Sequence, residues 1–235
     1  MTHHVRHHVS VTSGAEKRLL VWMARRLPSW IHSDHLTVLA LAAMALAGAG
    51  YALARYDPRA LWLVVFALAL NWLGDSLDGT LARVRRAERP RYGFYVDHVL
   101  DIVGITLLMA GLAGSGFMSP ILALALLVSY LLVSGEVFLA TAVRQVFRMS
   151  FLGFGPTELR MVLAVGTLAL FRDPHVEIEA LGRFPLFDVG AIVATAGLAV
   201  TLAVNIARNT SALACAEPRV HIRSMKPAAV SEYGT

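Results

Sequence analysis

The chain has 235 residues, of which 57% are hydrophobic, and it carries a formal net charge of +5. Its mean hydropathy of +0.61 is typical of a polytopic membrane protein and excludes an ordinary soluble domain. The single cysteine, Cys215, excludes a disulfide framework within the chain. The sequence pI near 9.8 would suit nucleic acid. Because the basic residues are distributed by membrane side, as counted below, we expect no nucleic-acid partner.

Residues 1–32 divide into a polar tail and a basic, apolar segment. Residues 1–13 are polar and rich in histidine, and we interpret them as a flexible tail rather than a metal site. Residues 14–32 alternate basic side chains such as Lys17 with apolar ones such as Trp22. This pattern predicts an amphipathic helix that lies on the anionic cytoplasmic leaflet. The N-terminus lacks the n-region, h-region and cleavage site of a signal peptide.

Six apolar runs follow, at residues 36–54, 60–74, 93–117, 119–143, 156–171 and 186–207. Runs of this kind are typical of helices that cross a bilayer. The fourth run is interrupted by Glu136, for which Arg144 is a candidate partner. We therefore predict an all-α integral membrane protein with six transmembrane helices and an N-terminal interfacial amphipathic helix. Residues 14–209 form a single membrane domain, and residues 210–235 form a flexible cytoplasmic tail.

Basic residues are distributed unevenly between the two sides that six spans define. The N-terminal segment, the loop at 83–91, the region at 144–160 and the C-terminal tail hold 17 of the 21 lysines and arginines. The opposite side holds the other four, which are Arg55, Arg59, Arg172 and Arg183. The positive-inside rule therefore predicts that both termini lie at the cytoplasmic face.

Four carboxylates lie at the edges of the second and third runs. Asp75 and Asp78 are three residues apart and Asp97 and Asp101 are four apart, so on helices each pair shares one face. Carboxylates at membrane depth are costly when unpaired, and four of them facing one another would repel. A divalent cation between them removes both costs. Ligands that are all carboxylate oxygens suit magnesium, calcium or manganese rather than zinc.

The acids belong to a longer pattern, D-x2-D-G-x2-A-R-x9-G-x3-D-x3-D, which adds Gly79, Ala82, Arg83 and Gly93. Small residues beside carboxylates let a ligand approach, although tight helix packing is the alternative explanation for both glycines. Arg83 can hold a phosphate oxygen or anchor its helix at the membrane surface. The pattern resembles the signature of the CDP-alcohol phosphatidyltransferase family. Its one difference lies in a loop, where insertions are tolerated: nine residues separate Arg83 from Gly93, rather than about eight.

The resemblance implies an enzyme that moves the phospho-group of a CDP-linked donor to an acceptor alcohol and releases CMP. It implies two bound ions, Mg²⁺ or Mn²⁺, held by Asp75, Asp78, Asp97 and Asp101. Asp101 would also be the general base. The nucleotide and diphosphate contacts would be Gly79, Ala82, Arg83 and Gly93. Enzymes of the family act on membrane lipid and are often homodimers, and two metals can stabilise both the attacking and the leaving oxygens.

His98 directly follows Asp97 and is a second candidate for the catalytic base. Choline and ethanolamine phosphotransferases that use diacylglycerol carry the same Asp-His pair, and a later Thr-Glu pair that Thr157-Glu158 resembles. The competing interpretation is a histidine that caps or packs, because on an ideal helix it points about 100° away from Asp97. Both interpretations stay open.

The leading interpretation is a phosphatidyltransferase of phospholipid biosynthesis that uses CDP-diacylglycerol. The alternative within the family is a donor of the CDP-choline or CDP-ethanolamine type with a diacylglycerol-like acceptor. The alternative of another class is a divalent cation transporter, because intramembrane carboxylates alone would suit it. Transport does not require Gly79, Ala82 and Arg83 at these spacings, which favours the enzyme.

Overall fold

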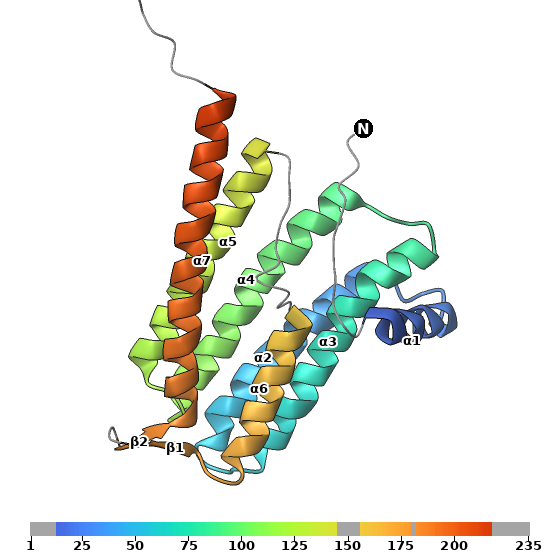
Figure 1. Ribbon diagram of the computed structural model, residues 1–235. Coiled ribbons are helices and arrows are strands. Elements are labelled where there is room, and N and C mark those ends of the chain that lie inside the picture. The colour runs from blue at the N-terminus through green and yellow to red at the C-terminus, as the bar shows by residue number, and fades with distance from the viewer. Residues whose placement is uncertain (1–12, 145–155, 180–181, 218–235) are drawn as a thin grey trace, which may run out of the picture.

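The computed structural model describes residues 13–144, 156–179 and 182–217. All but Ser13 of the polar tail expected over residues 1–13, and most of the tail expected over residues 210–235, lie outside this part of the chain. The described residues form seven helices (Figure 1): α1 (Ser13–Arg26), α2 (Ser33–Ala54), α3 (Ala60–Val84), α4 (Pro90–Ser115), α5 (Pro120–Arg144), α6 (Pro156–Leu170) and α7 (Leu186–Ala216).

Prolines begin three of these helices. Pro90, Pro120 and Pro156 are the first residues of α4, α5 and α6, where a missing N–H costs nothing and the fixed φ of proline is already helical. α4 ends at Gly116, whose φ of +83° lies in the left-handed region that favours glycine after a helix. The backbone N–H of Ser119 donates to Oδ1 of Asp188 at 2.6 Å, which ties the start of α5 to α7.

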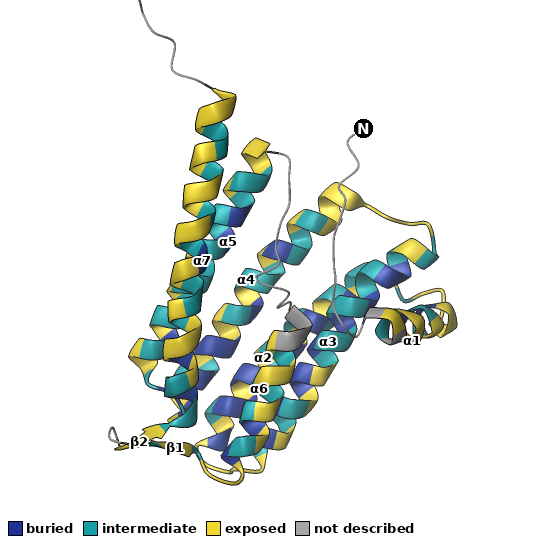
Figure 2. Cartoon of the chain, viewed as in Figure 1, coloured by how far each residue is buried: buried dark blue, intermediate teal, exposed yellow. Residues whose placement is uncertain are grey.

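Five of the described helices, α2 to α5 and α7, are long and apolar enough to cross a membrane. They have 22 to 31 residues, or about 33 to 46 Å at the helical rise. Large apolar side chains such as Trp62 and Phe66 are exposed, and exposed residues occur along all of the long helices (Figure 2). Contiguous exposed apolar surface of this kind is what lipid contact requires. The chain is therefore a multi-pass membrane protein, as predicted.

Three details differ from the expected arrangement. α6 has 15 residues, which is about 22 Å and shorter than a bilayer core of about 30 Å. The number of six spans therefore stays a prediction. α1 is a helix over the basic, apolar segment but ends at Arg26, and α7 continues to Ala216, beyond residue 209.

The described residues are helical as predicted, apart from a short antiparallel hairpin between α6 and α7 that the sequence analysis did not predict. Its strands are β1 (His175–Ile178) and β2 (Gly182–Pro185). Oδ1 of Asp173 accepts hydrogen bonds from the backbone N–H of His175 and from Arg183, both at 2.9 Å. These two contacts, the backbone one first, lower the pKa of Asp173 below its usual value. Strands of four residues are too short to show alternation in a sequence.

α2 is the central helix, because it packs against both α3 and α4. In the described residues α3 and α4 pack mainly on α2 and little on each other (Figure 1). A methyl group at Gly74 of α3 would lie 2.8 Å from the carbonyl oxygen of Leu36 in α2, and one at Gly111 of α4 would overlap the backbone of Gly48 in α2. Both helices therefore approach α2 at backbone distance, the arrangement that small residues permit in membranes.

Polar contacts connect α6 to α2 and connect α5 to α7. The Tyr51 hydroxyl of α2 and the Thr167 hydroxyl of α6 share a buried hydrogen bond of 2.7 Å. Between α5 and α7, the amide of Asn209 donates to Glu136 at 2.5 Å and accepts from Arg144. Asn209 thus bridges Glu136 and Arg144, the candidate partner of Glu136 from the sequence.

Candidate active site

Three of the four signature carboxylates meet in one place. Asp75 projects from α3, and Asp97 and Asp101 project from α4. One oxygen atom from each lies within 4.8 Å of the other two, and all three residues are partly buried. The i,i+4 spacing on α4 places its two acids on one helical face, as predicted. We call these three residues the acid cluster.

Asp78 lies on the same helix as Asp75 but outside the acid cluster. Its Oδ2 accepts a hydrogen bond from the Thr37 hydroxyl of α2 at 2.8 Å, and its Oδ1 accepts one from the backbone N–H of Gly79. Both carboxylate oxygens therefore have a donor within the protein. Asp78 therefore lies near the acid cluster on α3, but its oxygens are not among the three that converge there.

Arg160 of α6 is a contact of the acid cluster that the sequence interpretation missed. Its Nη2 lies 2.8 Å from Oδ2 of Asp75, with 14% of the arginine side chain and 25% of the aspartate side chain exposed. The sequence offered one indication, a basic residue next to a long apolar run, but the positive-inside pattern explained it equally well.

His98 is buried in an aromatic environment between α4 and α5. Its ring stacks on Phe94 with a centroid distance of 4.2 Å and meets Phe138 edge-on at 5.3 Å. Its Nδ1 lies 2.7 Å from the carbonyl oxygen of Phe94 and 3.8 Å from Oδ2 of Asp97. The packing role that the sequence left open is therefore present, and His98 also stays close to the acid cluster.

Within the described residues, the two signature glycines do not pack against other helices. A methyl group at Gly79 would come no closer than 3.4 Å to the end of the Arg83 side chain, and one at Gly93 would meet nothing within 4 Å. Tight helix packing therefore does not explain either residue: Gly93 leaves open space, and only the flexible end of the Arg83 side chain lies over Gly79. Arg83 is exposed, and its Nη2 donates to the Thr80 hydroxyl at 3.2 Å.

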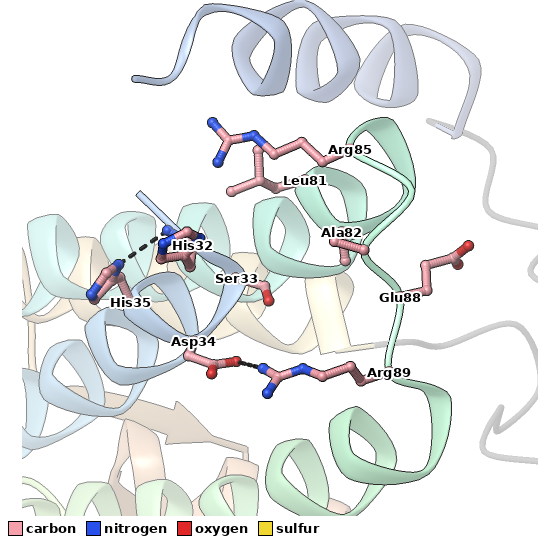
Figure 3. Close-up of a pocket in the computed structure, with 10 residues that line it drawn as sticks. His32, Ser33, Asp34, His35, Leu81, Ala82, Arg85, Glu88 and Arg89 are labelled. Carbon is pink, nitrogen blue, oxygen red and sulfur yellow. Dashed lines mark hydrogen bonds and ion pairs between the residues drawn. The ribbon is translucent and has the colours of Figure 1, made fainter. Parts of the chain in front are cut away.

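A polar pocket of about 540 Å³ lies where α2 begins and α3 ends. Ala82 lines it together with Asp34, Arg85 and Arg89, and Figure 3 shows Asp34 and Arg89 pointing toward each other across one side. The hydrogen bond to Asp34 raises the pKa of Arg89. Arg85 turns toward α1, where it donates to the carbonyl oxygens of Leu27 at 3.0 Å and Pro28 at 2.8 Å. The pocket thus combines both signs of charge with one signature residue.

An apolar groove of about 420 Å³ lies on the other side of the acid cluster along α3. Its lining comes from α1, α3 and α6 and includes Trp72 and Arg160. The Trp72 indole N–H donates to Glu16 of α1 at 3.0 Å, which holds α1 against this groove. Along α3, therefore, Trp72 marks the groove, Asp75 the acid cluster and Ala82 the polar pocket.

Comparisons with known proteins identify a family and a similar fold. The family model described as CDP-alcohol phosphatidyltransferase matches residues 30–212. A comparison with curated proteins gave no match. The fold resembles that of the phosphatidylinositol phosphate synthase PgsA1 of Mycobacterium tuberculosis, solved with CDP-DAG bound, with a TM-score of 0.63 at 18% sequence identity, over 82% of this chain and 94% of that chain. Because the family model spans well over half of its length, the chain belongs to the CDP-alcohol phosphatidyltransferase family.

Proposed function

We propose that the protein transfers a phosphatidyl group from CDP-diacylglycerol to an acceptor alcohol and releases CMP. The observation that carries the proposal is the order of sites along α3, with an apolar groove, an acid cluster and a polar pocket in succession. A nucleotide-linked lipid needs these three environments in this order. Acyl chains suit the groove, the diphosphate suits a metal-loaded cluster, and the cytidine suits the pocket.

The acid cluster fits a hard divalent cation. Three carboxylate oxygens within 4.8 Å of one another are a donor set for Mg²⁺ or Mn²⁺. In this proposal the cluster holds one ion, and Asp78 helps to hold a second. When bound, the ions would neutralise the diphosphate and stabilise the attacking and leaving oxygens.

The remaining signature residues would position the donor. Gly93 leaves open space near the acids, and only the flexible Arg83 side chain lies over Gly79, so phosphate oxygens can approach the helix backbone at both positions. Ala82 forms part of the pocket wall. Arg83 has an exposed guanidinium whose contact to Thr80, at 3.2 Å, is long enough to exchange for a phosphate oxygen.

In the proposed reaction, the acceptor hydroxyl oxygen attacks the phosphorus that carries the diacylglycerol. Asp101 accepts the hydroxyl proton as a general base. The bond between that phosphorus and the bridging oxygen breaks, and CMP leaves with the electron pair. Such in-line transfer depends on positioning and charge neutralisation more than on covalent catalysis.

The second candidate within the family uses a CDP-choline or CDP-ethanolamine donor, with His98 as base. The Nδ1 contact of His98 to the Phe94 carbonyl and its stacked ring support a packing role, which favours Asp101. A cation transporter is disfavoured because the three acids gather in one place, and because the groove and the pocket precede and follow Asp75 along α3. We further propose that the active site and both termini are cytoplasmic, because 17 of the 21 lysines and arginines lie on that side. By family resemblance, we also propose a homodimer.

An assay of CMP release tests the function. Purified protein is given cytidine-labelled CDP-diacylglycerol or CDP-choline, each with a panel of alcohols that includes glycerol phosphate, inositol phosphate, serine and diacylglycerol. We expect CMP only from CDP-diacylglycerol with a soluble alcohol. CMP only from CDP-choline with diacylglycerol would move the assignment to the second candidate. No CMP from either donor, together with Mn²⁺ uptake into proteoliposomes, would establish a transporter instead.

A further inference from the structure

Arg160 is a cation bound to the acid cluster, although it lies outside the signature. Its Nη2 contacts Oδ2 of Asp75 at 2.8 Å. Its other terminal nitrogen, Nη1, is buried and has no hydrogen-bond partner among the described residues. A buried guanidinium nitrogen without an acceptor is costly. In this position Arg160 uses Nη2 to bind Asp75, while Nη1 remains available for another acceptor.

A metal ion and Arg160 require the same carboxylate. Asp75 supplies one of the three oxygens that converge in the acid cluster, and the guanidinium already neutralises it. Two cations a few ångströms apart repel each other, most strongly where the surroundings are partly buried. An ion in the cluster therefore weakens the Arg160–Asp75 contact, and that contact in turn weakens ion binding.

We infer that Arg160 is a positioning residue with two alternative partners. Without metal it pairs with Asp75 and offsets the repulsion among the three acids. When an ion occupies the cluster, Arg160 gives up Asp75 and offers both terminal nitrogens to a phosphate group of the ligand, which suits the planar fork of arginine. This inference rests on the proposed metal site and adds a competitor built into the chain.

Mn²⁺ binding to the purified protein, followed by electron paramagnetic resonance without substrate, tests the first half. Arg160→Gln removes the competing charge, and we expect it to bind Mn²⁺ at least about tenfold more tightly, the scale on which one neighbouring charge changes proton affinity. Arg160→Lys keeps the charge and should bind Mn²⁺ like the wild type. Arg208→Gln, an exposed arginine of α7, is the matched control and should change nothing.

Ligand binding to the Mn²⁺-loaded proteins tests the second half. We expect Arg160→Gln to weaken the binding of CDP or of glycerol 3-phosphate by about ten- to hundredfold, the range for hydrogen bonds to a charged group. Loss of CDP affinity assigns the arginine to the donor phosphate, and loss of glycerol 3-phosphate affinity assigns it to an acceptor phosphate. The inference predicts that Arg160→Gln binds Mn²⁺ more tightly and the anion more weakly. Structural damage would instead lower both affinities.

The outcomes separate this inference from the proposed function. If the wild type binds no Mn²⁺, the metal site is wrong and the inference falls with it. If the wild type binds Mn²⁺ and Arg160→Gln binds it equally well or more weakly, only the inference is overturned. Should Arg160→Gln not yield folded protein, Arg160→Lys carries the test: unchanged Mn²⁺ affinity with weaker anion binding supports the inference, and a fall in both contradicts it.

Discussion

Thr37 and Asp78 join two membrane helices by a side-chain hydrogen bond: the Thr37 hydroxyl of α2 donates to Oδ2 of Asp78 in α3 at 2.8 Å. The backbone N–H of Gly79 donates to the other oxygen. The two donors fix the plane of a carboxylate that the signature marks as a metal ligand. Outer contacts of this kind commonly decide how well a ligand is oriented.

Thr37→Val is expected to reduce activity, because it removes the hydroxyl that orients Asp78 while keeping the side-chain shape. Loss of such a contact typically costs about 10- to 100-fold in metal affinity or activity. Thr37→Ser keeps the hydroxyl and should retain most of the activity. Transfer rates measured against Mn²⁺ concentration give the result, and wild-type metal dependence in Thr37→Val would contradict a role for this contact.

The acids themselves are tested by chelation and by amide substitution. We expect chelator to abolish transfer and Mg²⁺ or Mn²⁺ to restore it, because the clustered carboxylates repel without a cation. Asp75→Asn, Asp78→Asn and Asp97→Asn should each weaken metal binding. Asp57→Asn is the control, because Asp57 is exposed in the loop between α2 and α3, at the opposite end of α3 from Asp78. Full activity in any of the three signature variants would contradict the assignment of that aspartate as a metal ligand.

Asp101 and His98 are separated as candidate bases by replacements that keep the general shape of each side chain. Asp101→Asn should lower the single-turnover rate by roughly 10²–10⁴-fold, the usual contribution of a general base, while CDP still binds. His98→Phe preserves the stacking with Phe94 and Phe138 and should keep most of the activity. Normal turnover of Asp101→Asn beside an inactive His98→Phe would make His98 the base and favour the diacylglycerol-using branch.

Gly111 and Gly114 provide a matched pair on α4 for the packing of this helix on α2. Gly111→Ala would push a methyl group into the backbone of Gly48, and overpacking of this type costs about 1–3 kcal/mol. Gly114→Ala meets nothing within 4 Å and should stabilise the helix by about 0.5–1 kcal/mol. Thermal unfolding in detergent compares them. Equal midpoints would show that the α2–α4 contact is looser than the structure indicates.

The orientation of the chain is open to cysteine labelling. In a Cys215→Ser background, Pro58→Cys and His175→Cys should react with an impermeant maleimide added outside intact cells, because both lie on the side that holds only four basic residues. Native Cys215, which is exposed, should react only after permeabilisation. Labelling of either new cysteine from the cytoplasmic side alone would reverse the proposed topology.

The sequence predicted the acid cluster because helical spacing and residue type act locally. Asp97 and Asp101 share a face by periodicity, and mutual repulsion indicates a cation wherever they meet Asp75. It could not predict Arg160 or Thr37 as partners, since both contacts join different helices. Arg160 resembles any cytoplasmic anchor and Thr37 any polar residue at a helix start. The hairpin after α6 was missed because its four-residue strands are too short to show alternation, and because periodicity does not report the contacts of Asp173 with both strands.

α2 contributes no carboxylate to the acid cluster, yet it sets the separation of the two helices that do. α3 is held against it at Gly74 and α4 at Gly111, each at backbone distance. The three converging oxygens are therefore preorganised through a third helix, so an arriving ion orders little of the protein and loses little affinity to that cost. A bound ion would add a direct link between α3 and α4, which pack little on each other in the described residues. Stripping it should leave the helix arrangement intact and lower the unfolding temperature only by the mass-action term that any bound ligand adds.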